Sequence, residues 1–340
     1  MKTRTFQITR WIVTALIVGA LAWYVYANRN EVEIFQNLQP GPLLILLVIT
    51  IIASFVSSTQ YLALFRSLGV KIGVWECFEL SNVGAAASLF IPQGNSLVKM
   101  AYLKQNYGIP LSRSPVMFLG LLVIFIYVGG FILLAANIIS VFMSVNMPIV
   151  LWVVSVGAIL SAVIFWIDIP AGFTNRLGRI GNLLREFITG WQELRKDRRC
   201  LVEVSIFEVA NFLLAGLMVW AAYNALGRSI HPLLGVGLII FISFSNLFVI
   251  TPANIGVQEA FYGVLSQMAG YEFVYGVAVS AVMRAATLAV TILFAPPSWY
   301  FLIFRKNIGL NLNQMKNQPE GPGIDQPVVE LPSGPNQRNI

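Results

Sequence analysis

Residues 116–139 read VMFLGLLVIFIYVGGFILLAANII, a stretch that contains no charged side chain. A helix needs about 20 consecutive apolar residues to cross the hydrocarbon core of a bilayer, so this stretch is long enough to span a membrane. Because backbone amides in hydrocarbon must be hydrogen-bonded within their own segment, the stretch is predicted to be a helix. Other stretches of similar length and character are 11–27, 43–65, 148–167, 204–226 and 274–295.

The composition is that of a membrane protein. Apolar residues make up 57% of the 340 residues and charged residues only 11%, whereas a soluble domain carries about 25% charged residues. A transmembrane barrel would show alternating segments of about ten residues, and the sequence has none. We therefore predict an all-α, polytopic transmembrane helix bundle with about six full spans and no soluble catalytic domain.

Cysteine and histidine are scarce. The cysteines are Cys77 and Cys200, which lie within or beside apolar stretches, and the single histidine is His231. This set excludes the usual Cys/His zinc sites and gives no sign of a disulfide framework. We predict no catalytic residue, no metal site and no cofactor.

The net charge of +7 is distributed unevenly along the chain. If the N-terminus is cytoplasmic and the spans alternate, only Arg29, Arg228 and Arg284 of the 22 Lys and Arg residues fall outside the cytoplasmic segments. Such a positive-inside bias is typical of a bacterial cytoplasmic (inner) membrane protein. We therefore predict that both termini are cytoplasmic and that the positive charge does not serve nucleic-acid binding.

The loop 169–199 carries a cluster of basic residues with aromatic and aliphatic residues between them. This pattern favours an amphipathic helix on the anionic inner leaflet of the membrane. A specific site for a lipid headgroup or for a protein partner is the alternative interpretation.

The composition changes sharply after residue 306. The remaining segment is rich in Asn, Pro, Gly and Gln and has few large apolar residues. Such a segment cannot bury enough apolar surface to fold by itself. We predict a transmembrane domain over residues 1–306 and a disordered cytoplasmic tail over 307–340.

Two apolar regions are interrupted by Pro, Gly and Asn. Residues 74–107 contain IPQGN at 91–95, and residues 233–271 contain TPANIG at 251–256. Proline and glycine break a helix and free backbone groups, which at membrane depth is tolerated only inside protein or beside a watery cavity. Each region is predicted to be a broken or re-entrant helix hairpin.

The two broken regions resemble each other. A Ser-Asn pair precedes each proline, and a charged residue follows each proline by seven positions: Lys99 in the first region and Glu259 in the second. The first region follows Arg66 and Lys71, and the second follows Arg228, so the charge pattern predicts that they enter the membrane from opposite sides. Opposed broken helices are typical of inverted-repeat transporters, whose binding sites lie between the breaks.

Charged side chains within the spans are the strongest functional candidates, because charge at membrane depth is costly. Arg284 lies mid-span, so it needs a partner or a wet cavity. One interpretation is an ion pair with Glu259. The other, which is compatible with the first, is that Arg284 and Lys99 attract a lipid phosphate while Glu259 positions the arginine. Glu203 is predicted to pair with interfacial arginines, and Glu208, which lies deeper, is a candidate for a proton-linked role.

The helix starts that follow the two breaks add backbone groups that attract anions. The unpaired amides of a helix N-terminus favour negative charge. Gly94 and Asn95 occupy this position after the first break, and Asn254 and Gly256 after the second. Asn and Gly are also ordinary capping residues, so plain capping is the alternative.

The stretch TPANIGVQEA, residues 251–260, resembles the PGG-x-G-x-x-E signature of the lysylphosphatidylglycerol synthase transmembrane-region family. The matching residues are Pro252, Gly256 and Glu259, while Ala253 and Asn254 stand where glycines are usual. The stretch 91–114 is similar to the family's other Pro-Gly segment, and Arg284 falls where the family tends to carry an arginine in its last span. The resemblance covers roughly residues 8–305.

The resemblance implies a lipid flippase-like domain. Members flip, or are thought to flip, phospholipids or polyprenyl-linked lipids between leaflets, and in the best-known member an aminoacyl transferase domain follows. Only the tail follows here, so we expect no lipid aminoacylation and no enzyme activity. Together with the opposed breaks, the resemblance predicts a translocase that binds an anionic phospholipid or polyprenyl-linked headgroup near the midplane.

Translocation has two alternatives from other classes of function. A non-transporting accessory protein of an envelope lipid or glycan synthesis complex, partnered with a lipid-modifying enzyme, is the main alternative. A membrane-embedded enzyme is disfavoured, because such enzymes cluster Asp, Glu or His at one membrane face, and the outer loops here are short and poor in acid.

Overall fold

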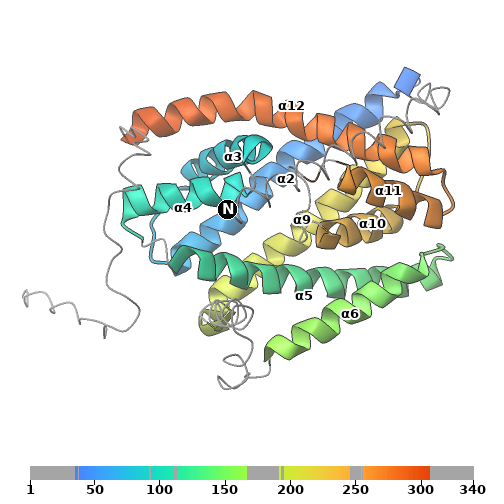
Figure 1. The fold of residues 1–340 in the computed structure, drawn as a ribbon, viewed down its shortest axis with the longest axis horizontal. Helices are drawn as coiled ribbons and strands as arrows, with labels where there is room; N and C mark the ends of the chain where they lie inside the picture. Colours follow the sequence, from blue (N-terminus) through green and yellow to red (C-terminus); the bar gives the residue numbers. More distant parts are fainter. Residues whose placement is uncertain are drawn as a thin grey trace, which may run out of the picture. The chain divides into compact units, whose positions relative to one another are not determined.

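The computed structural model describes residues 35–36, 38–91, 93–109, 113–166, 191–192, 195–245, 254 and 256–306. These ranges contain helices and no strand, in agreement with the predicted all-α class. The helices are α2 (Pro40–Ser67), α3 (Val74–Phe90), α4 (Gly94–Tyr107), α5 (Arg113–Phe142), α6 (Ile149–Trp166), α9 (Arg198–Ala225), α10 (Pro232–Ser245), α11 (Val257–Met268) and α12 (Phe273–Lys306) (Figure 1). Predictions that fall on 11–27, 169–190, Pro92, Pro252 and 307–340 lie outside the described residues.

Within the described ranges, four helices are long and apolar enough to cross a membrane: Pro40–Ser67, Gly120–Phe142, Arg198–Ala225 and Phe273–Leu302. They coincide with the predicted spans 43–65, 116–139, 204–226 and 274–295. The predicted span 148–167 forms α6, which has 18 residues. The chain is therefore a polytopic helix bundle, and the total of six spans stays a prediction because 11–27 is not described.

Helices α2 and α9 form a long antiparallel pair. At one end the backbone N–H of Gln39 donates to the carbonyl oxygen of Ala225 (2.9 Å). Near the other end the thiol of Cys200 donates to the carbonyl oxygen of Ala63 (3.7 Å). The end of α2 therefore lies beside the start of α9, and the reverse holds at the far end (Figure 1).

The two long helices, α2 and α9, end in turns of the same type. The N–H of Val70 donates to the carbonyl of Phe65 (3.0 Å), and the N–H of Arg228 donates to the carbonyl of Tyr223 (3.0 Å). Each turn has a Leu-Gly pair whose glycine is left-handed, Gly69 with φ +78° and Gly227 with φ +74°. This is the Schellman type of helix ending, in which glycine accepts the positive φ without steric cost.

Each turn leads into a half-length helix that runs back along the long helix before it. Cys77 on α3 donates its thiol to the carbonyl of Ser58 on α2 (3.1 Å), and Val236 on α10 packs against Gly216 on α9. Because α2 and α9 are antiparallel, the α3–α4 unit and the α10–α11 unit extend from opposite ends of the bundle (Figure 1). The predicted inverted arrangement is thus present.

Both predicted breaks are also present, as judged from their described flanks. Helix α3 ends at Phe90 and α4 begins at Gly94, with Gln93 in the left-handed conformation (φ 59°) between them. Helix α10 ends at Ser245 and α11 begins at Val257, preceded by left-handed Asn254 (φ 51°). A left-handed residue cannot continue a right-handed α-helix, and residues with a side chain rarely adopt this conformation. The chain therefore leaves the helical path at both breaks.

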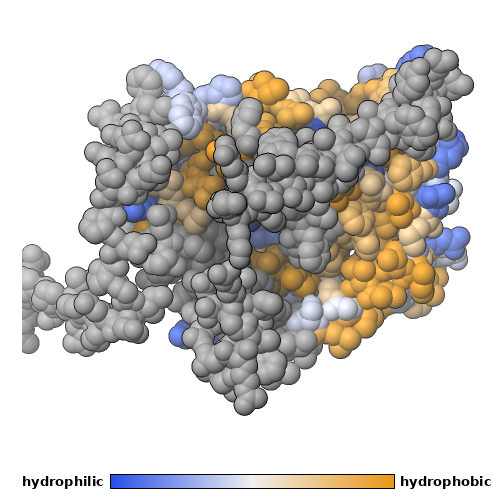
Figure 2. Space-filling view, in the orientation of Figure 1, coloured by the Kyte–Doolittle hydropathy of each residue, from blue (hydrophilic) through white to orange (hydrophobic). Residues whose placement is uncertain are grey.

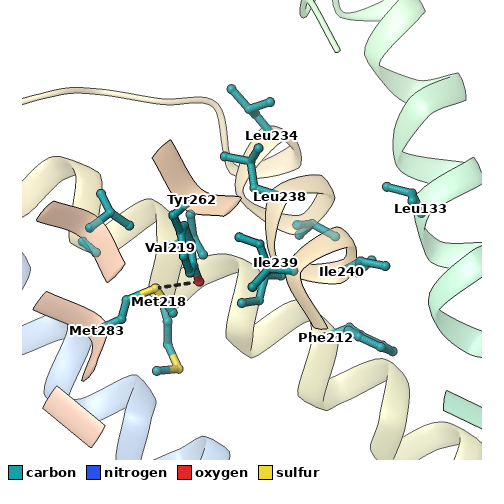
Figure 3. Close-up of a cluster of buried hydrophobic side chains, with 14 of the residues drawn as sticks. Leu133, Phe212, Met218, Val219, Leu234, Leu238, Ile239, Ile240, Tyr262 and Met283 are labelled. Atoms are coloured by element: carbon teal, nitrogen blue, oxygen red, sulfur yellow. Dashed lines mark hydrogen bonds between the residues drawn. The ribbon is translucent and has the colours of Figure 1, made fainter. Parts of the chain in front are cut away.

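A buried apolar cluster holds the second unit in place. On α10, Ile240 points toward the side of Leu133 on α5, and Ile239 points toward Val219 on α9 and Tyr262 (Figure 3). In the same cluster the Tyr262 hydroxyl of α11 donates to the sulfur of Met283 on α12 (3.3 Å). The half-helices are therefore packed inside the bundle, as a broken helix in a membrane requires.

The described surface is largely apolar. On α6, Ile149, Val153 and Leu160 are each more than half exposed. Figure 2 shows hydrophobic side chains over much of the visible described surface, with most hydrophilic ones near its edges. Soluble proteins rarely expose a large contiguous apolar patch, so this surface fits contact with lipid.

Candidate functional site

A cavity of about 590 Å³ lies between α2, α4, α5, α9 and α10. Its lining is partly polar although most of the helices that form it are apolar. Ser96 of α4 and Ser243 of α10 both contribute, so each broken unit reaches the same space. The full lining is Ala53, Ser57, Gln60, Tyr61, Ser96, Leu121, Leu122, Phe125, Glu208, Asn211, Phe212, Ala215 and Ser243.

The polar side of the cavity is a chain of three side chains that joins α2 to α9. Gln60 donates its amide N–H to Oε2 of Glu208, and Asn211 donates to Oε1 of Gln60 (3.1 Å). Glu208 is 7% exposed. A buried carboxyl group needs hydrogen-bond donors or a counter-charge, and here the donors are neutral amides.

A buried cation lies directly behind this cavity. The Lys99 side chain of α4 is fully buried, and its ammonium sits 3.0 Å from the centre of the Tyr61 ring. Tyr61 also lines the cavity, so the ring separates the cation from the open space. Among the described residues, the Lys99 ammonium has no hydrogen-bond partner. The cation–π contact is the main favourable interaction of the charge, and three N–H donors stay unmatched.

The α3–α4 hairpin holds two further unmatched polar atoms. Within the described part of the chain, neither Oγ of Ser81 nor Oδ1 of Asn95 has a hydrogen-bond partner, and both atoms are buried. Native proteins satisfy most buried polar groups. The hairpin thus holds three buried polar groups without a hydrogen-bond partner among the described residues, and one of them is the Lys99 ammonium. This makes the hairpin more polar inside than the helices around it.

The backbone amides at the start of α4 are already engaged. The N–H of Gly94 donates to the carbonyl of Ile91 (2.9 Å), and the N–H of Asn95 donates to the hydroxyl of Ser88 (2.8 Å). Their bonds are those of an ordinary cap. Among the described residues at and after this break, the buried side-chain atoms with no hydrogen-bond partner are Oδ1 of Asn95 and Nζ of Lys99.

The start of α11 is capped by Glu259. One carboxylate oxygen of Glu259 accepts a hydrogen bond from the backbone N–H of Gly256 (2.7 Å). Asn254, two residues earlier, is half-buried and left-handed. The amide at Gly256 is thus occupied, and capping accounts for this position as well.

The other oxygen of Glu259 pairs with Arg284. The guanidinium Nη2 lies 2.8 Å from Oε1 of Glu259 and also donates to Gln258 (3.2 Å). The Arg284 and Glu259 side chains are 28% and 13% exposed. The predicted ion pair is confirmed, and Glu259 both fixes the start of α11 and neutralises the mid-span arginine.

The two predicted phosphate-binding cations contact different elements. Lys99 lies on Tyr61 of α2, whereas Arg284 lies against Glu259 and Gln258 of α11. Their joint contact with one headgroup stays a prediction. The predicted pairing of Glu203 with a neighbouring arginine is confirmed, since it accepts a hydrogen bond from the exposed Arg199 (2.8 Å), and its place at the interface stays a prediction.

Gln60 and Tyr61 are functional candidates that the sequence analysis missed. The signal was the polar run Ser57-Ser58-Thr59-Gln60 inside an otherwise apolar span. Polar residues in a transmembrane helix face the protein interior more often than lipid, so this run marks the inward face of α2.

The family match covers this whole arrangement. The model of the lysylphosphatidylglycerol synthase TM region matches residues 11–295. The chain belongs to the lysylphosphatidylglycerol synthase TM-region family. The matched part of this family member includes both broken units, the cavity and the Glu259–Arg284 pair. A search of curated proteins gives no significant match, and a search of solved structures gives none either.

Proposed function

We propose that the protein is an integral membrane lipid translocase of the flippase type. It moves an anionic phospholipid or a polyprenyl-linked lipid between the leaflets by passing the headgroup through the cavity. The observation that carries the proposal is the partly polar cavity bordered by both inverted broken units. Inverted-repeat transporters bind their substrates between such units and alternate access by moving one unit against the other.

The size of the cavity supports a headgroup rather than a whole lipid as its occupant. A volume of about 590 Å³ lies within the roughly 300–1,000 Å³ typical of small-molecule sites. Acyl or polyprenyl tails would then stay in the bilayer, against the apolar outer face of the helices. The tails need no polar path, so the barrier to movement lies in the headgroup alone.

The charge of the site supports an anionic headgroup. Lys99 is a buried cation whose donors find no partner in the described part of the chain, and it lies one helical turn beyond the cavity-lining Ser96. A phosphate that displaces the Tyr61 ring would supply the acceptors that the ammonium lacks. Arg284 acts at the second break, where Glu259 holds it until a phosphate competes for the guanidinium.

The remaining assignments follow from the same proposal. The protein resides in a bacterial cytoplasmic membrane with both termini inside, and the loop 169–199 rests on the anionic inner leaflet. Its partner is the lipid itself, and it performs no covalent chemistry.

The test is lipid movement in reconstituted vesicles. An anionic phospholipid with a fluorescent label is placed in one leaflet, and its movement is followed with a membrane-impermeant quencher. Lys99→Gln should slow the movement by roughly 10- to 100-fold, because a charged hydrogen bond contributes about 1.5–3 kcal/mol. Lys104→Gln on the same helix is the matched control and should move lipid at the wild-type rate.

Two results decide against the proposal. Wild-type protein that moves no anionic or polyprenyl-linked lipid would favour the accessory role instead. Equal rates for Lys99→Gln and Lys104→Gln would remove the cation from the mechanism.

A further inference from the structure

The carboxyl group of Glu208 poses a problem for an anionic substrate. It lines the cavity, and the groups that hydrogen-bond it are the neutral amides of Gln60 and Asn211. Among the described residues, no basic side chain lies within ion-pair distance of Glu208. An ionised Glu208 would therefore face an incoming phosphate with like charge.

No other titratable group among the described residues around Glu208 neutralises its charge. From α2, Tyr61 lines the same cavity. From α4, Lys99 lies against the Tyr61 ring rather than in the cavity, and Cys77 of α3 donates its thiol to Ser58. From α5 and α10 the cavity is lined by Leu121, Leu122, Phe125 and Ser243, which do not titrate. Glu208 is the one carboxyl group among the described lining residues.

We propose that Glu208 takes up one proton from water when an anionic headgroup enters the cavity, so that headgroup and proton bind together. The inference rests on the proposed function and adds a coupling ion to it. The proton goes onto a carboxylate oxygen, and the amide of Gln60 can turn to accept from or donate to either form. With Glu208 neutral, the cavity and Lys99 together receive the phosphate without a second negative charge.

The strength of the coupling follows from the size of the cavity. A phosphate at the centre of a sphere of 590 Å³ lies about 5 Å from its wall, and at an effective dielectric constant of about 20 two like charges at that distance weaken binding by roughly 200-fold. When the phosphate is bound, protonation of Glu208 is therefore favoured over charge repulsion across a pH range wide enough to measure. In that range linkage requires the affinity to fall about tenfold for each pH unit.

The coupling is tested by equilibrium binding to the full chain in detergent micelles. The probe is radiolabelled phosphatidylglycerol, a phosphodiester, because a phosphomonoester would itself titrate near pH 6. On the alkaline side of the pH profile, wild-type affinity should fall about tenfold for each unit by which the pH is raised. Glu208→Gln should bind with an affinity that does not vary with pH. Glu203→Gln, on the same helix but outside the cavity and paired with the exposed Arg199, is the matched control and should keep the wild-type slope.

A second measurement uses the wild-type protein alone. In weakly buffered solution with a pH indicator, binding of phosphatidylglycerol on the alkaline limb should remove one proton from solution per lipid bound. No proton uptake, or a pH slope that persists in Glu208→Gln, overturns the coupling while the proposed function stands. A slope that responds to sodium instead of pH also overturns it. No binding by wild type at any pH rejects the proposed function, and the coupling with it.

Discussion

The Glu259–Arg284 pair gives the sharpest energetic prediction, because Glu259 has two structural roles. It caps α11 through the N–H of Gly256, and it neutralises a mid-span guanidinium. Glu259→Ala removes both, at about 1 kcal/mol for the cap and about 2 kcal/mol for the unpaired arginine. The second figure is roughly half of the value for a fully buried pair, because Arg284 is more than a quarter exposed.

A double-mutant cycle separates the two roles. Glu259→Gln keeps an oxygen for the cap and loses only the charge, so it should cost about 2 kcal/mol, and Arg284→Gln should cost a similar amount. The double variant should cost no more than either single one, which gives a coupling energy of about 2 kcal/mol. The free energy of unfolding is measured by equilibrium denaturation in mixed detergent micelles.

The exposed pair Arg199–Glu203 is the matched control. Its nitrogen–oxygen distance is the same 2.8 Å, but the Arg199 side chain is 84% exposed. The equivalent cycle there should give no measurable coupling, since solvent screens the pair. A coupling at Glu259–Arg284 as small as that of the control would refute the view that Arg284 depends on this carboxylate.

Two further predictions concern packing and the cavity. Gly94→Ala should destabilise the protein by about 1–3 kcal/mol, because the new Cβ atom would lie 2.5 Å from the carbonyl oxygen of Ala87. Gly157→Ala in α6 should instead stabilise the protein by about 0.5–1 kcal/mol, because nothing lies within 4 Å of the Cβ position there. Equal effects in the same unfolding assay would contradict the close α3–α4 contact. Gln60→Leu should cost about 1–3 kcal/mol at neutral pH by removing one of the two amide groups that hydrogen-bond Glu208, and a variant as stable as wild type would show that the carboxyl group does not rely on Gln60.

The sequence sufficed for features that depend on local pattern. The spans follow from apolar length alone, and the breaks follow from proline, glycine and asparagine inside apolar stretches. The ion pair was predictable because an arginine such as Arg284, with apolar residues on both sides, must find an acid, and Glu259 directly follows the second break. The cap at Gly256 was also open to prediction, since an acid three residues into a helix is the capping-box spacing.

The cavity depends instead on the register of distant helices, which no local pattern specifies. Gln60 and Glu208 are 148 residues apart in the chain and meet because α2 and α9 cross antiparallel. The position of Lys99 on Tyr61 likewise depends on how the α3–α4 hairpin folds against α2. The sequence therefore predicts Lys99 only as a headgroup ligand, whereas the structure shows that the Tyr61 ring covers it.

The most direct test of the central claim is a crosslink between Ser96 and Ser243, which bring the two broken units to one cavity. Both are replaced by cysteine in a chain whose native Cys77 and Cys200 are replaced by serine. A cleavable crosslinker of about 10 Å, the diameter of a sphere of 590 Å³, is then applied. We predict that the crosslink forms, stops lipid movement in reconstituted vesicles and releases it on cleavage. Lipid movement that continues in the crosslinked protein would contradict the account.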